Sequence, residues 1–585
     1  MKCDKKVFFC GFCLEGEAAD LERGFETSLE AAGITATRLM AGPLRIWVGQ
    51  SRPRAFSVVA SGDGTGVAVG ELLWEGPNSQ PRTAEQDSAR LAAALSEGRP
   101  EDAVAANGSF AFLYFDRRAG RLWLMADSLG SRPVYVHESR GAVFFSTVLD
   151  LLLRHPAVPR VFDFAAFAEQ SAFCYPLGGA TLYRDIRVLQ DSEYLAWSNG
   201  SSSRRRYYDW SQVELRQASL EEAAESCREA LEQAVADRAP GAGEVARVLL
   251  SGGLDSRSVA AALLRSGARV EAATLVVEGS LDAHYARRVA AVMGIPLTET
   301  AWDPASTPVV TGHVTAAALS AAARPFGSAR VFTGDGGGET FGFLLMPAEV
   351  MSLMGRGQPD AAMRAWLHGH GAPSRVFRQP WRRIIEQRPL EAMGKAMQRF
   401  SRLPGQKALH LFIVLNDLRR HLHDAYEASA RTGLDIAAPF YDRRVLQSVL
   451  SLAPPLDPYL GHRLYHEIVR HWPDACFRVP WQTYPGHLPC PVADPPEMTA
   501  GLRDQWEVLQ QLNRRTGDVR RRWAVKSLAS GRAPARLLNL PLLTTAILGH
   551  KLRLFDRSHL FAPVQQLACC IHPGSEIAGI PAKGT

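Results

Sequence analysis

The chain has 585 residues, of which 46% are hydrophobic and 22% are charged, and its formal net charge is +6. This length predicts two to four domains, and the composition is that of a soluble globular protein. The sequence has no apolar run near the roughly 20 residues of a membrane span, and so small a positive surplus does not indicate nucleic acid binding. We therefore expect a cytoplasmic protein with no membrane span and no nucleic acid partner.

The first residues, "MKCDKKVFFCGFC", combine lysines with a short apolar run. The run is brief and no small-residue cleavage site follows, so it predicts a buried first strand and not a signal peptide. Nine scattered cysteines are typical of a reducing compartment. Isolated core thiols are the default interpretation of Cys10 and Cys13. The alternative is a zinc site that they would share with Cys569, Cys570 and His572.

From Val7 to about Trp210 the pattern predicts short strands separated by turns. Residues 108–127 read as a hairpin, and residues 141–148 and 192–200 are further strand candidates. The polar stretch "NGSSSRRR" (199–206) predicts a loop, and it is the best candidate for a domain boundary region.

After this stretch, Ser219 and Glu222 form a capping box at the start of a helix over about 219–239. Apolar strands then alternate with helices: strands at 245–250, 270–277 and 295–302, and helices at 256–264 and 283–293. This βαβ alternation predicts a parallel sheet covered by helices. Beyond about residue 350 the chain is mainly helical. With the boundary region near 199–206, we expect domains at 1–205 and 206–560 and a C-terminal tail at 561–585.

The turn "SGGLDS" (251–256) joins the first of these strands to its helix. Free backbone amides and a helix N-terminus there favour phosphate oxygens. Gly252 and Gly253 allow close approach, Ser251 and Ser256 add hydroxyls, and Asp255 would hold a divalent cation that bridges to the phosphates. The alternative is a plain strand-to-helix turn with Asp255 or Ser256 as its cap.

SGGxDS is similar to the pyrophosphate loop of the ATP pyrophosphatases, and four further segments resemble the asparagine synthetase superfamily. They are "NGSFAFLYFD" with "DSLGSRPVYV" (107–116 and 127–136), "TLYRDIRVLQDSEYLAW" (181–197), "TGDGGGETFGF" (333–343) and "GLDIAAPFYDRRVLQSVLSL" (433–452). The resemblance implies an α/β protein. Its N-terminal part would be a degenerate Ntn-type, glutaminase-like αββα domain. Its C-terminal part would be a PP-loop ATP pyrophosphatase domain, like the adenine nucleotide α hydrolases, with a parallel sheet and a helical extension.

The resemblance also implies ATP- and Mg²⁺-dependent activation of a carboxylate, which attacks the α-phosphorus of ATP before an amine captures the acyl-adenylate. Asp335 occupies the position of a family carboxylate that assists proton removal from the amine. Gly338 stands where the family has a magnesium-binding aspartate, so Asp335 or Glu339 would join Asp255 as metal ligands. The ATP-binding residues implied by the match are Leu249, Ser251, Gly252, Gly253, Asp255, Ser256, Leu275, Val276, Thr333 and Gly334.

Two departures from the family narrow the function. A glutaminase of this type needs cysteine at position 2, where this sequence has Lys2, and Cys3 comes one residue too late. Glutamine is therefore not expected to be the nitrogen source. The segment "RVPWQTYPGHLPCP" (478–491) lacks the lysine that asparagine synthetases carry here. Arg478 and His487 are candidate catalytic replacements for it, with purely structural roles as the alternative.

These departures favour an amine brought by the substrate itself. The leading hypothesis is a lasso peptide cyclase, which adenylates an Asp or Glu side chain of a precursor peptide and joins it to the peptide's N-terminal amine, releasing AMP and pyrophosphate. The alternatives are a small-molecule amide or β-lactam synthetase and a non-catalytic nucleotide- or peptide-binding protein. Resemblance implies a leader peptidase and a leader-binding protein as partners. The basic segment Arg514–Arg536 is either a site for an acidic leader or partner or a solvated helix.

Overall fold

The computed structural model describes residues 8–14, 19–49, 56–61, 64–74, 83–139, 141–302, 314–327, 329–368, 370–472, 474–504, 507–508, 524–530, 534–551, 560, 562–572 and 575–577. Lys2, Cys3, the first ten residues of the basic segment 514–536 and the last eight residues lie outside the described residues. Among the residues described, no helix is both long enough and apolar enough to cross a membrane.

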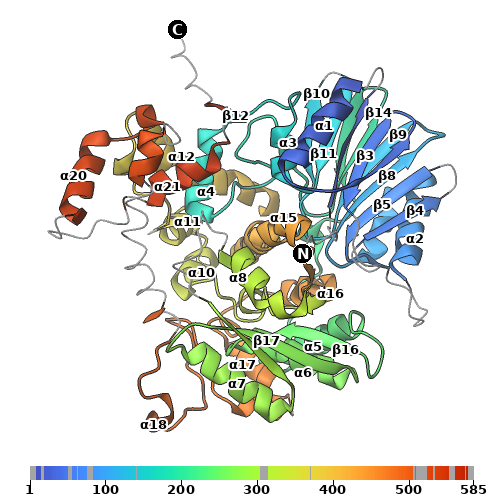
Figure 1. The fold of residues 1–585 in the computed structure, drawn as a ribbon. Coiled ribbons are helices and arrows are strands. Elements are labelled where there is room, and N and C mark those ends of the chain that lie inside the picture. The colour runs from blue at the N-terminus through green and yellow to red at the C-terminus, as the bar shows by residue number, and fades with distance from the viewer. Residues whose placement is uncertain are drawn as a thin grey trace.

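The N-terminal domain consists of two antiparallel six-stranded sheets packed face to face (Figure 1). The strand order in one sheet is β13 (Arg187–Val188), β10 (Tyr135–Ser139), β11 (Ala142–Ser146), β1 (Phe8–Leu14), β3 (Leu44–Gly49) and β2 (Thr37–Ala41). The order in the other is β15 (Ser201–Arg206), β14 (Glu193–Ser198), β9 (Arg121–Ala126), β8 (Phe110–Asp116), β5 (Gly64–Gly70) and β4 (Phe56–Ser61).

Helices cover both outer faces of this pair of sheets. Helices α1 (Ala19–Ala31) and α3 (Leu149–Arg154) pack on the first sheet, and α2 (Ala84–Ser96) packs on the second. Strand β8 is apolar at successive positions because Leu113 and its alternate neighbours face the other sheet, whereas Phe112 and its neighbours face α2. The predicted αββα domain and the hairpin β8–β9 are confirmed.

Cys10 and Cys13 are both buried in β1 on opposite faces of its sheet. Cys10 packs with the helices outside, and Cys13 packs between the two sheets, so the two thiols cannot share an ion. The zinc site considered as an alternative is therefore wrong, and the placement of both thiols in the core is confirmed.

The loop predicted over "NGSSSRRR" is wrong for residues 201–206, which form strand β15. This strand pairs antiparallel with β14, so that Arg206 lies opposite Glu193 and Ser201 lies opposite Ser198. Asn199 and Gly200 form the hairpin turn with positive φ angles of 50° and 70°. Serine and arginine side chains suit an exposed edge strand, where only the backbone has to pair on one side. Side-chain polarity alone therefore did not identify the pairing.

The second domain is built on a five-stranded parallel sheet, as the βαβ alternation predicted. Its strand order is β18 (Leu297–Ala301), β17 (Arg269–Val276), β16 (Val245–Leu249), β19 (Arg330–Phe332) and β20 (Asp435–Ala437), and its main helices are α5 (Leu220–Ala236), α6 (Leu254–Arg265), α7 (Leu281–Met293) and α8 (Val314–Ala322). The predicted capping box starts α5: Glu222 N donates to Ser219 Oγ (3.1 Å), and Ser219 N donates to Glu222 Oε2 (2.8 Å).

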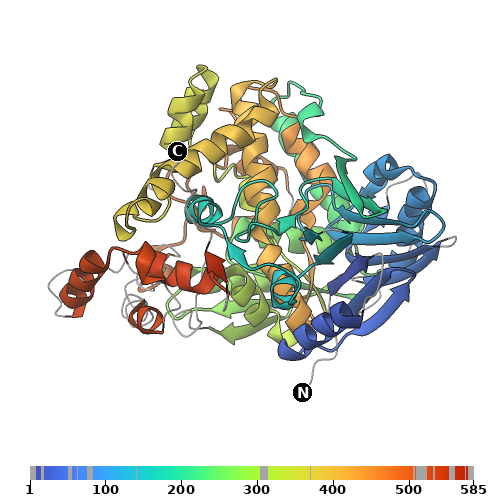
Figure 2. The same ribbon diagram turned by 90° about the horizontal axis from the view of Figure 1, so that it is seen from above.

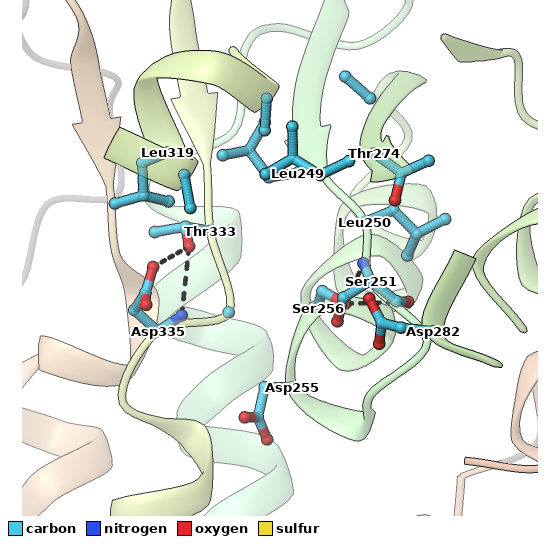
Figure 3. A pocket seen from close by; sticks show the side chains of 15 residues that line it. Leu249, Leu250, Ser251, Asp255, Ser256, Thr274, Asp282, Leu319, Thr333 and Asp335 are labelled. Carbon is cyan, nitrogen blue, oxygen red and sulfur yellow. Dashed lines mark hydrogen bonds between the residues drawn. The ribbon is translucent and has the colours of Figure 1, made fainter. Parts of the chain in front are cut away.

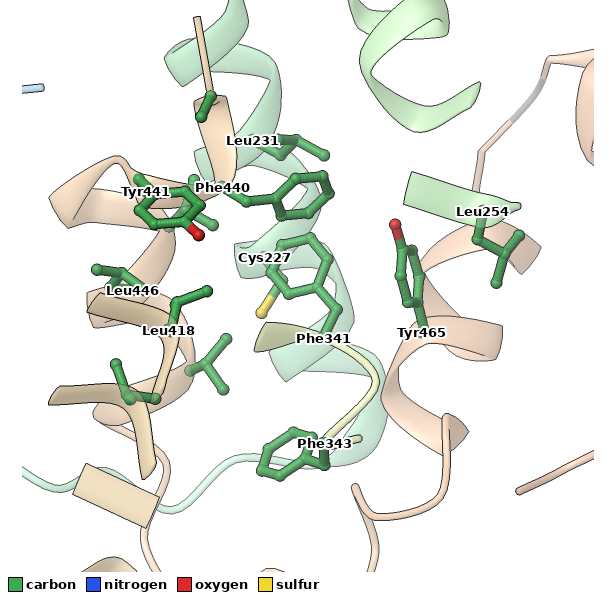
Figure 4. Packing of buried hydrophobic residues seen from close by; sticks show 14 of the residues in the cluster. Cys227, Leu231, Leu254, Phe341, Phe343, Leu418, Phe440, Tyr441, Leu446 and Tyr465 are labelled. Atoms are coloured by element: carbon green, nitrogen blue, oxygen red, sulfur yellow. The ribbon is translucent and has the colours of Figure 1, made fainter. Parts of the chain in front are cut away.

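A mainly helical region follows, as predicted. It contains α9 (Gly337–Thr340), α10 (Ala348–Gly355), α11 (Pro359–Leu367), α12 (Trp381–Met397), α13 (Gly405–Ile413), a π-helical turn (Val414–Leu418), α15 (His423–Thr432), α16 (Arg443–Leu450) and α17 (Arg463–Arg470). Figure 4 shows how Phe341 and Phe440 pack between α5 and Tyr465 of α17 in the core of this domain.

The C-terminal helices return to the N-terminal domain. Helices α20 (Leu540–Lys551) and α21 (Ala562–Cys570) pack with α12 and with α4 (Phe164–Phe173), which follows α3 in the chain (Figures 1 and 2). Strand β21 (Glu576–Ile577) pairs in parallel with β12 (Val161–Phe162). Strand β21 thus lies beside residues about 400 positions earlier in the chain.

A buried polar network joins the two domains. Asp442, which precedes α16, is fully buried and accepts hydrogen bonds from Arg238 (2.7 Å) and from Asn107 Nδ2 of the N-terminal domain (3.0 Å). Arg238 also pairs with Glu71 of the N-terminal domain at 2.5 Å. Although burial opposes it, the neighbouring Arg238 and Arg444 hold the pKa of Asp442 well below its ordinary range. Two sequence segments that resemble the same superfamily thus meet at this network.

Replacing Asp442 by Asn should destabilise the protein by roughly 3–5 kcal/mol, because it removes one partner of a buried ion pair. A depressed pKa contributes stability above the unfolded value of about 3.9, and this stability is lost as the pH falls. The unfolding free energy of the wild type should therefore decline more steeply than that of Asp442→Asn below about pH 4. Denaturant titrations at several pH values measure this. The exposed Asp185→Asn serves as control, and equal pH dependence in Asp442→Asn and wild type would contradict the account.

Candidate active site

A cavity of about 270 Å³ lies at the carboxyl ends of β16, β17 and β19 (Figure 3). In open parallel sheets this edge is where ligands bind, because the strand-to-helix loops gather there. Leu249, Leu275 and Leu319 give it an apolar wall, and Ser251 and Ser256 lie beside it. The predicted residues that line it are Leu249, Ser251, Asp255, Ser256, Leu275, Thr333, Gly334 and Asp335.

The loop 251–256 is held open by its own side chains. Ser251 N donates to Ser256 Oγ (2.9 Å), and the two serine hydroxyl oxygens are 3.1 Å apart. Gly253 N donates to Ser251 Oγ at 3.1 Å, and Gly253 is the N-cap of α6. The helix N-terminus therefore faces the cavity with hydroxyl groups already placed beside it, an arrangement that favours a phosphate group.

Glycines allow the segment 333–338 to approach this loop closely. A Cβ on Gly334 would lie 2.5 Å from Ser256 N, and one on Gly337 would lie 2.6 Å from the Asp255 carboxyl. Gly336 has a φ of +90° and N-caps the short helix α9. The glycine-rich sequence is thus a steric requirement for contact with Asp255. Gly338 is different, since its Cβ would lie at an ordinary 3.7 Å from Asp255 Oδ2.

Acidic side chains gather behind the loop. Removal from water and the Glu339 carboxylate raise the pKa of Asp255 to about 7, and the same two causes raise the pKa of Asp417 to about 6. Asp335 differs because His421 lies 3.4 Å away, and this pairing outweighs burial and lowers the pKa of Asp335. A positive charge would relieve the repulsion around Asp255.

These carboxylates fit a magnesium ion that completes its shell with phosphate oxygens and water, as Mg²⁺ usually does. Among the residues that the structure describes, no three His, Cys, Asp or Glu side chains are grouped closely enough to hold a metal ion by themselves. Asp255 is the best placed of the predicted ligands, because the Asp335 carboxylate already accepts a hydrogen bond from Thr333 Oγ1 and pairs with His421. When bound, the ion would supply positive charge for the phosphates.

Several residues in and around the site were not predicted. Asp282 lines the cavity and accepts a hydrogen bond from Gly252 N (2.9 Å), and Tyr465 hydrogen-bonds the Asp255 carboxyl group. Tyr484 lies close to Gly338 and feels the charge of Asp255. Of these residues, only Asp282 could have been predicted from the sequence, because an acidic residue at the start of the helix that follows the second strand lies at the ligand-binding edge of the sheet.

Arg257 is a second unpredicted residue, and it is fully buried in the first turn of α6. Its guanidinium donates to the carbonyls of Gly252 (2.7 Å) and Gly253 (3.0 Å) in the loop. It also donates to the carbonyls of Cys476, Val479 and Pro480, at 2.6–3.0 Å. The Arg257 side chain thus connects the loop 251–256 to residues 476–480, which follow α17.

Not all predicted site residues line the cavity. Gly252, Gly253 and Val276 belong to its loop and strand but do not line it, and Glu339 lies behind the loop in α9. Arg478 is exposed and lines no part of the cavity. His487 does not line the cavity either. It contacts His462 (Nδ1–Nδ1, 2.5 Å), and the rings of His462 and His487 both lie beside Tyr484, at centroid distances of 5.7 and 6.1 Å.

Comparison with known families agrees with this geometry. Residues 226–459 match the family model for asparagine synthase, and residues 78–208 match the one for the glutamine amidotransferase domain. The two matches support the asparagine synthetase superfamily for this chain. The fold is therefore an Ntn-type, glutamine amidotransferase-like domain followed by an asparagine synthase domain. The match to asparagine synthase supports an ATP-dependent amide ligase. The exact domain limits remain predictions.

No curated protein matches the sequence. Among solved structures, the chain is similar to the allosteric regulatory enzyme of purine biosynthesis at 12% identity, covering 56% of this chain and 74% of that one with a TM-score of 0.22. It is also similar to glutamine PRPP amidotransferase from B. subtilis complexed with ADP and GMP, at 12% identity, 82% and 99% coverage and a TM-score of 0.23. Scores this low add nothing to the functional argument.

Gly337→Ala should weaken the binding of α,β-methylene-ATP by about a hundredfold, because the new methyl group displaces the Asp255 carboxyl and distorts the loop. Gly338→Ala is the matched control, and it should bind the nucleotide as wild type does, since its methyl group meets only ordinary contacts. Isothermal titration calorimetry measures both affinities. Equal losses in the two variants would show that the close approach at Gly337 is unimportant.

Arg257→Lys should also weaken nucleotide binding, by about tenfold, because a single ammonium group cannot hold the loop and the segment 476–480 together. Arg265→Lys, near the other end of α6 and on the surface, is the control. Calorimetry gives the affinity, and thermal unfolding reports whether the fold survives. A lysine variant with wild-type affinity would remove Arg257 from the role of a positioning residue.

Proposed function

We propose that this protein is an ATP-dependent, AMP-forming ligase that cyclises a peptide by joining an Asp or Glu side chain to the peptide's own N-terminal amine. The observation that carries the proposal is a second cavity of about 940 Å³ between the two domains. This volume is at the upper end of the range for small-molecule sites, and it suits a peptide better than a single amino acid.

The two cavities share a wall at the acidic cluster, which consists of Asp255, Asp335, Glu339 and Asp417. Asp335 lines the nucleotide cavity, and His421 and Asp417 line the larger one, while Asp335 and His421 are 3.4 Å apart. A substrate carboxylate in the large cavity would thus face a nucleotide across this pair. The walls come from α3 and β10 of the N-terminal domain, from the π-helical turn and the residues after it, and from the end of α21.

In the proposed reaction the substrate carboxylate attacks the α-phosphorus of ATP, and pyrophosphate leaves with the bond between the α- and β-phosphates broken. The amine nitrogen then attacks the activated carbonyl carbon, loses a proton to a nearby base, and releases AMP. Asp335 is the proposed base, because its lowered pKa keeps it ionised and its carboxylate lies at the wall between the cavities. Holding amine and acyl group in one cavity replaces a second binding event.

The large cavity also offers a means of shielding the activated acyl group. Tyr175 and Tyr183 lie in its wall, and the Tyr183 hydroxyl donates to Cys570 O (2.8 Å) and accepts from His572 N (2.9 Å). The end of α21 is thereby fixed over one side of the cavity. Excluding water there would favour attack by the amine over hydrolysis.

The proposal is tested with synthetic peptides that carry a free N-terminal amine and a single Asp or Glu. Incubation with ATP and Mg²⁺ should give a product lighter than the peptide by one water, with one AMP per product, as read by mass spectrometry. Asp255→Ala should abolish both, and the exposed Asp360→Ala should leave both unchanged.

Two results would remove the proposal. One is asparagine formation that depends on glutamine without any cyclic peptide, and the other is peptide-stimulated release of ADP and phosphate in place of AMP. A protein that keeps its biological activity after Asp255→Ala would instead be a binding protein without catalysis.

A further inference from the structure

A third cavity, of about 480 Å³, lies next to the large one on the outer side of residues 177–191. Thr181 and Tyr183 line both cavities, so the two are separated only by this short stretch of chain. The opposite wall of the outer cavity comes from α12 and the residues up to Phe400. The nucleotide chemistry does not account for this cavity, although part of its lining belongs to the segment 181–197 that resembles the superfamily.

The outer cavity is rich in cationic side chains. Five of its lining residues are arginine or lysine and three are carboxylates, a surplus of two positive charges. Two of the carboxylates already have arginine partners: Arg388 pairs with Glu169 (2.7 Å), and Arg399 pairs with Asp191 (2.7 Å). The third, Asp163, caps α4 by accepting hydrogen bonds from two backbone amides.

The three remaining cations, Arg184, Arg187 and Lys395, are exposed. Over the described ranges, the side chains of Arg184 and Lys395 take part in no hydrogen bond or ion pair. Arg187 acts electrostatically on Glu138, but that carboxylate is hydrogen-bonded to Arg204 and Ser202. These cations are therefore exposed lining residues of a concave site whose own carboxylates already have hydrogen-bond or ionic partners, which suits an anionic ligand.

We propose that this outer cavity binds an acidic stretch of the peptide substrate, at a distance in sequence from the carboxylate that reacts. The inference rests on the proposed function for the identity of the ligand as a peptide. The order of the three cavities supports it, because Thr181 and Tyr183 line both the large and the outer cavity. A peptide that leaves the large cavity beside these residues would come next to Arg184, Arg187 and Lys395. The cations of the outer cavity would then favour peptides with an acidic stretch through charge complementarity.

The test uses a short fluorescent peptide that alternates glycine and aspartate, and a matched peptide with asparagine in place of aspartate. The wild type should bind the acidic peptide in fluorescence anisotropy, with affinity that falls as salt is added, and should bind the asparagine peptide much more weakly. The triple variant Arg184→Gln, Arg187→Gln, Lys395→Gln should bind the acidic peptide about tenfold more weakly.

The control removes the same charges elsewhere: Arg117→Gln and Arg118→Gln in the β8–β9 turn and Arg90→Gln in α2, all exposed. It should bind the acidic peptide as the wild type does. Equal binding of both peptides, or equal losses in the two triple variants, would overturn the proposal.

Binding of α,β-methylene-ATP, measured on the same preparations, separates this proposal from the function it rests on. Nucleotide affinity should be unchanged in the triple variant, because the altered side chains lie outside the nucleotide cavity. A wild type that does not bind the nucleotide would count against the ligase function. Charge-dependent binding of the acidic peptide would, even then, identify the outer cavity as a binding site for acidic peptides.

Discussion

The close contact between Asp255 and the glycine-rich segment 333–338 is the constraint on which the rest of the site depends. Gly334 and Gly337 have no room for a side chain, so two loops from different strands meet over one carboxyl group. This contact removes Asp255 from bulk water next to Glu339, and the resulting repulsion makes the site receptive to a cation. The nucleotide cavity, the acidic cluster and its pairing with His421 all follow from this arrangement.

The two domains are also fixed to each other before any ligand binds. Asn107, Glu71, Arg238 and Asp442 form a buried polar network across the domain interface, with little exposure of any member. Removing one partner from such a network costs more than the network itself contributes, so it defines one relative position of the domains. The large cavity between the domains therefore has a defined shape, as proximity catalysis requires.

The sequence predicted the elements that depend on local pattern. The parallel sheet, the capping box at Ser219 and the loop after β16 follow from apolar periodicity and from glycine and serine spacing, and the structure has all three. Arg257 and Tyr465 were missed because their role depends on contacts with residues more than 200 positions away, and a buried arginine looks in sequence like a surface one. The strand at 201–206 was missed because edge pairing needs no apolar side chains. The nitrogen donor and the peptide substrate remain proposals.

The most direct test of the account is a crystal structure of the protein with α,β-methylene-ATP and Mg²⁺. The account predicts the triphosphate on residues 251–256, the adenine against Leu249 and Leu275, and the α-phosphorus on the side that faces Asp335 and the large cavity. A nucleotide bound elsewhere, or bound with its α-phosphorus turned away from the wall between the two cavities, would contradict the account.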